Sequence, residues 1–203
     1  MEKPNALASF VPATAADYCV TLWEQYQFEL RIVRPRRTRL GDFTQKPRQR
    51  PRITVNANLN PYSFLITYLH EIAHHVVYTT PTRKKLAPHG PEWKSAFREL
   101  LRPVLNEDVF PADILLPLCR YAANPKASTG SDAYLVEALA RYNEPDADVN
   151  KKSLLHLNEG VNFVFQKREF IRGPLRRTRV LCIEKSSNRR YTIPAHALVE
   201  ECV

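Results

Sequence analysis

The alternation of apolar and polar residues divides the chain into a first part of mixed helices and strands and a later part made mostly of strands. In the first part, apolar side chains recur at helical spacing, and then every second residue becomes apolar. The elements predicted there are a helix over Pro12–Tyr26 and strands over Phe28–Val33, Arg37–Phe43 and Arg52–Asn56. Because these strands cluster together instead of alternating with helices, the pattern predicts an α+β fold.

Prolines mark the starts of the two longest helices that follow. Asn60 is a suitable N-cap and Pro61 a suitable first helical residue, so we expect a helix from there to about Tyr78. Pro91 begins the next helix in the same way. Two shorter helices are predicted over Ala112–Tyr121 and Asp132–Tyr142.

A polar stretch at residues 143–152 precedes the strand-rich part and is the best candidate for a linker. Beyond it, strands are predicted over Val161–Gln166, Arg179–Glu184 and Arg190–Ile193, with turns at Gly173–Pro174 and Ser186–Asn188. We therefore expect a core at 1–110, a helical extension at 111–142, the linker, and a small basic β module at 153–203. In the core, a small antiparallel sheet is expected to pack on the helix that begins at Pro61.

The apolar helix contains the pattern His70-Glu71-x-x-His74, which is typical of zinc peptidases. Residues four apart lie about 40° from each other around a helix, so both imidazoles can bind one metal ion. Glu71 lies one step further round and can reach a water molecule on that ion. The alternative is a hydrogen-bonded polar network in the core, because polar groups on a mostly buried helix need partners.

A catalytic zinc site needs a third protein ligand and one open position for water. His89 is the stronger candidate, since it lies in the segment HGPEW, 15 residues after His74. Glu92 is the alternative, although it also suits the first turn of its helix as a partner of the helix dipole. His75 points about 100° away from His74 and is expected to pack or to support the site. Tyr78 lies on the polar stripe and suits packing equally well.

The segments HEIAHH and HGPEW together resemble the SprT-like family of zinc metallopeptidases, which includes the Spartan-type proteases of DNA–protein crosslink repair. The strand segments LRIVRPRRTRLGDF and RITVNANLN and the helix before them are also similar to that family, so the resemblance covers about residues 10–110. The resemblance implies a zincin-like fold, one Zn²⁺ held by His70, His74 and His89, and Glu71 as the general base of peptide hydrolysis. It also favours His89 over Glu92.

The chain departs from this family in its C-terminal part. Many SprT-like proteins carry a zinc ribbon with four cysteines there, whereas this region contains only Cys182 and Cys202. We therefore predict one zinc ion and a β module without metal. The chain lacks G-x-G-x-x-G and Walker A loops, an apolar run of 18 residues and a secretory signal pattern, which predicts no nucleotide loop, no membrane span and a cytoplasmic location.

The net charge of +9 is concentrated in two segments. Residues 31–52 and 167–190 each hold nine basic residues. Arginine forks match phosphate oxygens, so both segments are candidates for DNA binding, and the family resemblance favours that interpretation. The alternative is that these are solvated strand faces. The nearby aromatic residues are candidates either for base stacking or for the core of the β module: Phe163, Phe165, Phe170 and Tyr191.

The sequence thus supports three functional hypotheses. The leading one is a zinc-dependent endopeptidase that hydrolyses proteins bound or crosslinked to DNA. The second is a general cytosolic metallopeptidase that does not depend on nucleic acid. The third is a zinc-stabilised DNA-binding protein with little catalysis.

Overall fold

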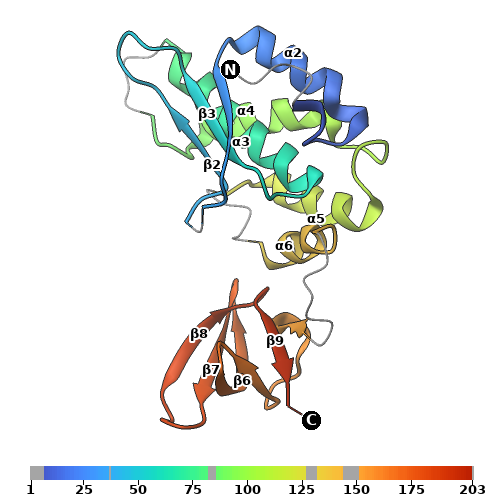
Figure 1. Cartoon of the computed structure of the whole chain (residues 1–203), viewed down its shortest axis with the longest axis vertical. Helices are drawn as coiled ribbons and strands as arrows, with labels where there is room; N and C mark the ends of the chain where they lie inside the picture. Colours follow the sequence, from blue (N-terminus) through green and yellow to red (C-terminus); the bar gives the residue numbers. More distant parts are fainter. Residues whose placement is uncertain (1–6, 37, 82–85, 127–131, 144–150, 203) are drawn as a thin grey trace. The chain divides into compact units, whose positions relative to one another are not determined.

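The computed structural model describes residues 7–36, 38–81, 86–126, 132–143 and 151–202 (Figure 1). The chain forms two compact units, an N-terminal unit at 1–127 and a C-terminal unit at 128–203. Most of the expected linker at 143–152 lies outside the described residues. Both helices and strands occur in separate groups along the chain, which confirms the expected α+β class.

The N-terminal unit contains most of the helices. Its elements are η1 (Ala13–Ala15), α2 (Ala16–Tyr26), β1 (Glu29–Val33), β2 (Gly41–Thr44), β3 (Arg52–Asn56), α3 (Pro61–Thr79), α4 (Pro91–Leu101), η2 (Arg102–Val104) and α5 (Ala112–Ala123). Strand β2 begins four residues later than predicted, and the first residue of the predicted strand, Arg37, lies outside the described residues.

The sheet of the N-terminal unit is mixed, so the expected antiparallel sheet is wrong. Its strand order is β1-β3-β2, with β3 antiparallel to β2 and parallel to β1. Strand β3 is central and has a partner strand on each edge, and its side chains Ile53 and Val55 are fully buried.

Helix α3 packs against β2, β3 and α4 (Figure 1). The Asn60 side chain accepts a 2.9 Å hydrogen bond from the backbone N–H of Ser63, which confirms the predicted N-cap. From Phe64 to Ala73 the helix is buried at every position except His70. The metal-site pattern therefore lies on a helix that is fixed along most of its circumference.

The C-terminal unit combines one helix with a six-stranded antiparallel sheet of order β4-β9-β5-β6-β7-β8. Its elements are α6 (Ala133–Ala140), β4 (Lys151–Ser153), η4 (Leu154–His156), β5 (Asn162–Phe165), β6 (Arg168–Arg176), β7 (Arg179–Glu184), β8 (Arg190–Pro194) and β9 (Leu198–Glu201). Phe163 and Phe170 are buried and stacked with their ring centroids 5.7 Å apart. These two rings therefore belong to the core of the unit and are not available for base stacking.

The predicted turn at Gly173–Pro174 is wrong, because both residues lie inside β6. A bulge shifts the pairing with β7 between Arg172 and Leu175, and this accommodates the proline. A Cβ atom at Gly173 would lie 2.6 Å from the carbonyl oxygen of Leu181, so the strands approach closely there. The actual turn follows at Arg177, where φ is +56°. Among the described residues, no helix is both long and apolar enough to cross a membrane.

Candidate metal centre

Three imidazoles converge at the surface of the N-terminal unit. The Nε2 atom of His70 lies 3.2 Å from Nε2 of His74 and 3.2 Å from Nε2 of His89. Within the described residues, these three form the one group of His, Cys, Asp or Glu side chains that could hold a metal ion. All three side chains are half-buried.

The nitrogen spacing fits a tetrahedral ion. Zinc binds imidazole nitrogen at about 2.0–2.1 Å, so two such ligands at the tetrahedral angle lie about 3.3 Å apart. The two measured separations of 3.2 Å are close to this value, and the potential ligand atoms of the group all lie within 4.8 Å of one another. Three protein nitrogens leave a fourth position for water or a substrate oxygen.

Helix α3 and the turn before α4 supply the three potential ligands. His70 and His74 are one turn apart on α3, and His89 directly precedes Gly90, the N-cap of α4. Trp93, in the first turn of α4, is fully buried and packs on all three imidazoles, with ring centroids 4.6, 5.6 and 4.8 Å from His70, His74 and His89. The Trp93 Nε1–H also donates a 3.4 Å hydrogen bond to the carbonyl oxygen of His70. Trp93 therefore couples the two helices at the point where the histidines meet.

The surroundings of the histidines keep them neutral, which is the form that binds metals. Burial, together with the neighbouring imidazoles, lowers the pKa of His70 from 6.5 to about 3. Burial and His89 lower the pKa of His74 to about 4. Burial also lowers the pKa of His89. At neutral pH a cation can therefore bind without an imidazolium first losing its proton.

Glu71 faces strand β2 from the next position of α3. Its side chain is 6% exposed, and burial followed by the repulsion of Asp42 raises its pKa from 4.5 to about 8. Arg36, Arg39 and a backbone hydrogen bond from Phe43 act in the opposite direction. In the metal-free protein the raised pKa keeps the Glu71 carboxyl group largely protonated at neutral pH, and once ionised it is a stronger base than an exposed glutamate.

Strand β2 is the edge of its sheet and lies directly against Glu71. A Cβ atom added to Gly41 would lie 2.5 Å from Glu71 Oε1, so the strand backbone approaches the carboxyl group as closely as a glycine permits. Gly41 pairs with Val55 and Phe43 pairs with Ile53 on one side of β2. In the described part of the chain, no strand pairs with the other side.

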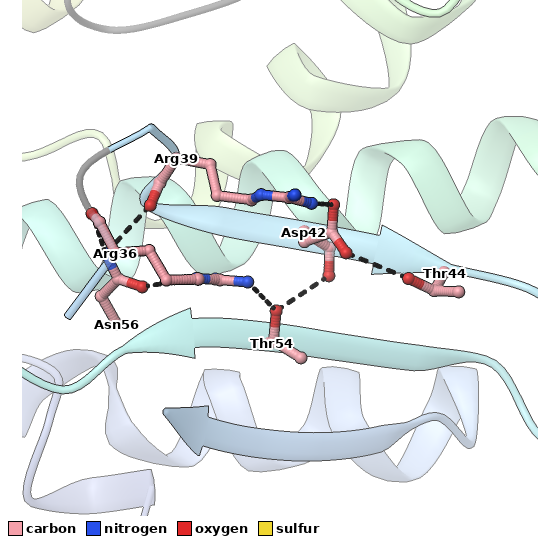
Figure 2. A network of polar contacts seen from close by, with 6 residues as sticks. All are labelled: Arg36, Arg39, Asp42, Thr44, Thr54 and Asn56. Atoms are coloured by element: carbon pink, nitrogen blue, oxygen red, sulfur yellow. Dashed lines mark hydrogen bonds and ion pairs between the residues drawn. The ribbon is translucent and has the colours of Figure 1, made fainter. Parts of the chain in front are cut away.

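A polar network holds the segment that leads into β2 (Figure 2). Asn56 is 1% exposed, and its Nδ2 donates hydrogen bonds to the carbonyl oxygens of Arg36, at 3.2 Å, and Arg39, at 2.9 Å. The Arg36 guanidinium donates in return to Asn56 Oδ1 at 2.9 Å and to Thr54 Oγ1 at 3.0 Å. Arg39 extends along β2 to Asp42, with 2.6 Å between Nη1 and Oδ1. The loop and the edge strand are therefore fastened to β3.

The other candidate residues lie apart from the three-histidine group. His75 Nε2 lies 3.0 Å from the carbonyl oxygen of Tyr26, and its ring packs against Phe43, which agrees with the predicted packing role. Glu92 is exposed and does not belong to the group. Tyr78 is 62% exposed and contacts the ring of Phe43 at 5.8 Å.

Sequence patterns did not indicate two features of the site. Gly41 approaches Glu71 from a strand 30 residues earlier, and the only signal was that glycine is rare, with five in the chain. Trp93 was recognisable as a buried helix residue, but its position against all three histidines depends on how α4 packs on α3.

Comparison with known proteins gave no relative. No family model, no curated protein and no solved structure matches the chain. The case for its function therefore depends on the three-histidine group, which could hold one metal ion, and on the residues around it.

Proposed function

We propose that the chain is a zinc-dependent endopeptidase related to the SprT-like proteins. The observation that carries this proposal is the convergence of His70, His74 and His89, with the buried Glu71 next to His70 in the same helix. A His-Glu-x-x-His helix with a third histidine further along the chain is the arrangement of a zincin. The motifs HEIAHH and HGPEW, which resemble SprT-like proteins, support the same assignment.

The three histidines fit zinc in number, in spacing and in protonation state. Three neutral imidazoles suit zinc better than magnesium or calcium, which prefer oxygen ligands. When bound there, zinc supplies Lewis acidity that activates a water molecule and polarises a peptide carbonyl. Trp93 holds the imidazole rings in place by packing against them.

In the proposed peptide hydrolysis, Glu71 acts first as the general base and then as the general acid. Its carboxylate accepts the proton of the attacking water at one Oε atom and then donates that proton to the leaving amine. Its raised pKa makes it a stronger base than an exposed glutamate. Because the group is 6% exposed, the proton is held close to the reacting atoms and exchanges little with bulk water.

The free edge of β2 supports a polypeptide substrate. An extended peptide can add to an exposed strand edge through backbone hydrogen bonds, whatever its side chains. Gly41 and Asp42 supply this edge next to Glu71, whereas the Phe43 backbone already bonds to the Glu71 carboxyl group. A peptide bound along β2 would therefore cross the catalytic group in an extended form, which is the form that an endopeptidase needs.

We further propose that the substrates are proteins on DNA, with the C-terminal unit as the main DNA-binding part. There, Arg168, Arg172 and Lys185 are neutralised by glutamates. In the described residues, the remaining cations of this segment form no ion pair with an acidic side chain; they are Lys167, Arg176, Arg177, Arg179, Arg189 and Arg190. Of these, Arg179 donates hydrogen bonds to Thr192. Unpaired arginines on a small sheet match the phosphate backbone of DNA.

The basic segment at 31–52 supports the alternative of a peptidase that does not depend on nucleic acid. Much of its charge serves the fold of its own unit: Arg31 pairs with Glu29, Arg39 pairs with Asp42, and Arg36 and Arg50 donate to neighbouring residues. These contacts favour a structural role for that segment.

The Glu71→Gln variant tests the peptidase proposal. It should keep the fold and zinc, and it should lower kcat for a fluorogenic peptide by about 10²–10⁴-fold because the proton acceptor is lost. A His89→Ala variant is the comparison, because it should lose zinc as well as activity. Wild-type cleavage by Glu71→Gln would refute the assigned mechanism. Zinc binding without any cleavage by the wild-type protein would favour the DNA-binding alternative.

Salt-dependent binding tests the DNA proposal. Replacing Arg176 and Arg177 with Gln should reduce the slope of log K against log salt concentration by about two, because each arginine contacts about one phosphate. Lys152→Gln is the matched control, since Glu201 already neutralises Lys152 at 2.9 Å. Equal effects of both changes, or no binding at low salt, would contradict a DNA-binding C-terminal unit.

A further inference from the structure

At Gly41 the edge strand β2 approaches the candidate catalytic helix α3 closely. A Cβ atom at Gly41 would lie 2.5 Å from Glu71 Oε1, 2.8 Å from Glu71 Cγ and 2.7 Å from Thr67 Cγ2. Contacts below 3.0 Å do not occur for a real Cβ atom, so a side chain at this position would force its neighbours to move. The space that a side chain would fill is occupied by the Glu71 carboxyl group.

Hydrogen bonds to β3 hold the backbone of β2 in place at Gly41, so the strand cannot easily move away from α3. Gly41 pairs with Val55 in β3, and the residue before it, Leu40, accepts a 2.9 Å hydrogen bond from the backbone N–H of Asn56. Asn56 also holds the carbonyl oxygens of Arg36 and Arg39. On the other side, the Thr67 hydroxyl donates a 2.8 Å hydrogen bond to the carbonyl oxygen of Ser63 within α3.

The movable atoms are therefore those of Glu71. Its carboxyl group is the far end of a flexible side chain, whereas β2 and α3 are both fixed by hydrogen bonds and by packing. Relaxation of a clash at Gly41 would turn the carboxyl group away and break the backbone hydrogen bond that it receives from Phe43.

We propose that Gly41 is a positioning residue for the Glu71 carboxyl group. The inference rests on the proposed peptidase function. By lacking a side chain, Gly41 admits the carboxyl group between β2 and α3, where the Phe43 backbone orients it. Gly41 acts through Glu71 and touches neither the histidines nor the reacting atoms. It therefore contributes to the rate of proton transfer and leaves metal binding unchanged.

The Gly41→Ala variant is the direct test. Its kcat for a fluorogenic peptide should fall at least tenfold, whereas KM and the zinc dissociation constant, measured by chelator competition, should each stay within about twofold. Gly160→Ala in the C-terminal unit is the control for a glycine substitution away from Glu71: nothing lies within 4 Å of an added Cβ, but φ is +86°, so this change should lower stability and leave kcat unchanged. An unchanged kcat in Gly41→Ala, or a loss of zinc affinity equal to the loss of kcat, would overturn the proposal.

A double-mutant cycle with Glu71→Asp tests whether Gly41 acts through Glu71. Aspartate is one methylene shorter and withdraws the carboxyl group from Gly41. The Gly41→Ala change should therefore have less than a twofold effect on kcat in the Glu71→Asp protein. Equal effects in both backgrounds would show that Gly41 acts independently of Glu71, which would overturn the assignment.

Two further measurements cover the other outcomes. If Gly41→Ala fails to fold, adding Thr67→Ser removes the methyl contact at 2.7 Å and keeps the hydroxyl, so the same test applies to the double variant.

The NMR chemical shift of the Phe43 amide in the metal-free protein reports the hydrogen bond to Glu71 and needs no measurement of enzyme activity. It should move in Gly41→Ala and not in Gly160→Ala, and an unmoved shift would refute the positioning role. If the wild-type protein cleaves nothing, the peptidase function fails, and this amide shift still decides the role of Gly41.

Discussion

At the scale of single residues, burial disfavours the charged forms of the Glu71 carboxyl group and of the imidazoles of His70, His74 and His89. Burial raises the pKa of Glu71 to about 8 and lowers those of His70 and His74 to about 3 and 4. A folded protein that keeps a proton on Glu71 and none on the histidines is adapted to receive a cation. Without a cation, the same arrangement makes stability depend on pH in two opposite directions.

We predict that the metal-free protein is most stable near pH 6.5. Below about pH 6.5, His70 and His74 become protonated in the unfolded chain but stay neutral in the folded protein, because folding lowers their pKa values. The free energy of unfolding therefore falls as the pH drops. Between 4.5 and about 8 the folded protein holds a proton on Glu71 that the unfolded chain releases, so this group opposes stability as the pH rises. Above pH 6.5 only the effect of Glu71 remains. It should reduce the free energy of unfolding by about 2 kcal/mol up to pH 8.

Denaturant unfolding in the presence of a chelator, between pH 5 and 8.5, measures this profile. Glu71→Gln should remove the decline above pH 6.5 and leave the decline on the acid side. The exposed Glu92→Gln is the control for loss of a glutamate and should keep both limbs. If Glu71→Gln retains the alkaline decline, another group is responsible for it.

At the scale of elements, Trp93 of α4 packs against α3 and against the three histidines, and so links the two helices at the candidate metal site. The indole is fully buried, stacks on Phe97 at 5.2 Å, and packs on the imidazoles that α3 and the residues before α4 supply. We predict that Trp93→Phe weakens zinc binding about tenfold, since groups that orient metal ligands contribute by about this factor. Chelator competition measures the affinity.

Trp23→Phe is the matched control for that prediction. Trp23 belongs to the same unit and donates a 2.9 Å hydrogen bond to the carbonyl oxygen of Phe28, away from the three histidines. The same chemical change there should reduce stability without altering zinc affinity. Equal weakening by both variants would indicate a general loosening of the unit and would contradict a specific role for Trp93.

The elements also show what the sequence could predict. The starts of α3 and α4 depend on Asn60, Pro61 and Pro91, which are local signals, and the structure confirms them. The histidine spacing within α3 is equally local. The parallel pairing of β1 with β3 and the contact of Gly41 with Glu71 join distant segments, so no local pattern could indicate them. The strand through Gly173 and Pro174 was missed because a bulge offsets the usual meaning of both residues.

At the scale of the whole molecule, the candidate metal site and the arginine-rich strands β6, β7 and β8 belong to different units. The three histidines lie in the N-terminal unit, and both tryptophans, Trp23 and Trp93, lie there too. The C-terminal unit has its own core around Phe163, Phe170 and Val180. Tryptophan fluorescence therefore reports unfolding of the metal-binding unit alone.

We predict that chelation lowers the melting temperature detected by tryptophan fluorescence. Zinc at 100 times its dissociation constant should stabilise the N-terminal unit by about 2.7 kcal/mol, because it binds the folded form. Calorimetry should show a second transition, from the C-terminal unit, that chelation does not move. An equal shift of both transitions, or none in fluorescence, would contradict a metal site confined to the N-terminal unit.

The exposed edge of β2 has a further consequence for the state of the protein in solution. An open strand edge is a starting point for aggregation, because a second chain can pair with it. Strand β2 is four residues long, carries the Arg39–Asp42 ion pair beside it, and leads through Lys46 to Pro47. Short length, charge and a nearby proline all discourage sheets of different molecules from joining. These features of β2 therefore oppose edge-to-edge association of two copies of the protein.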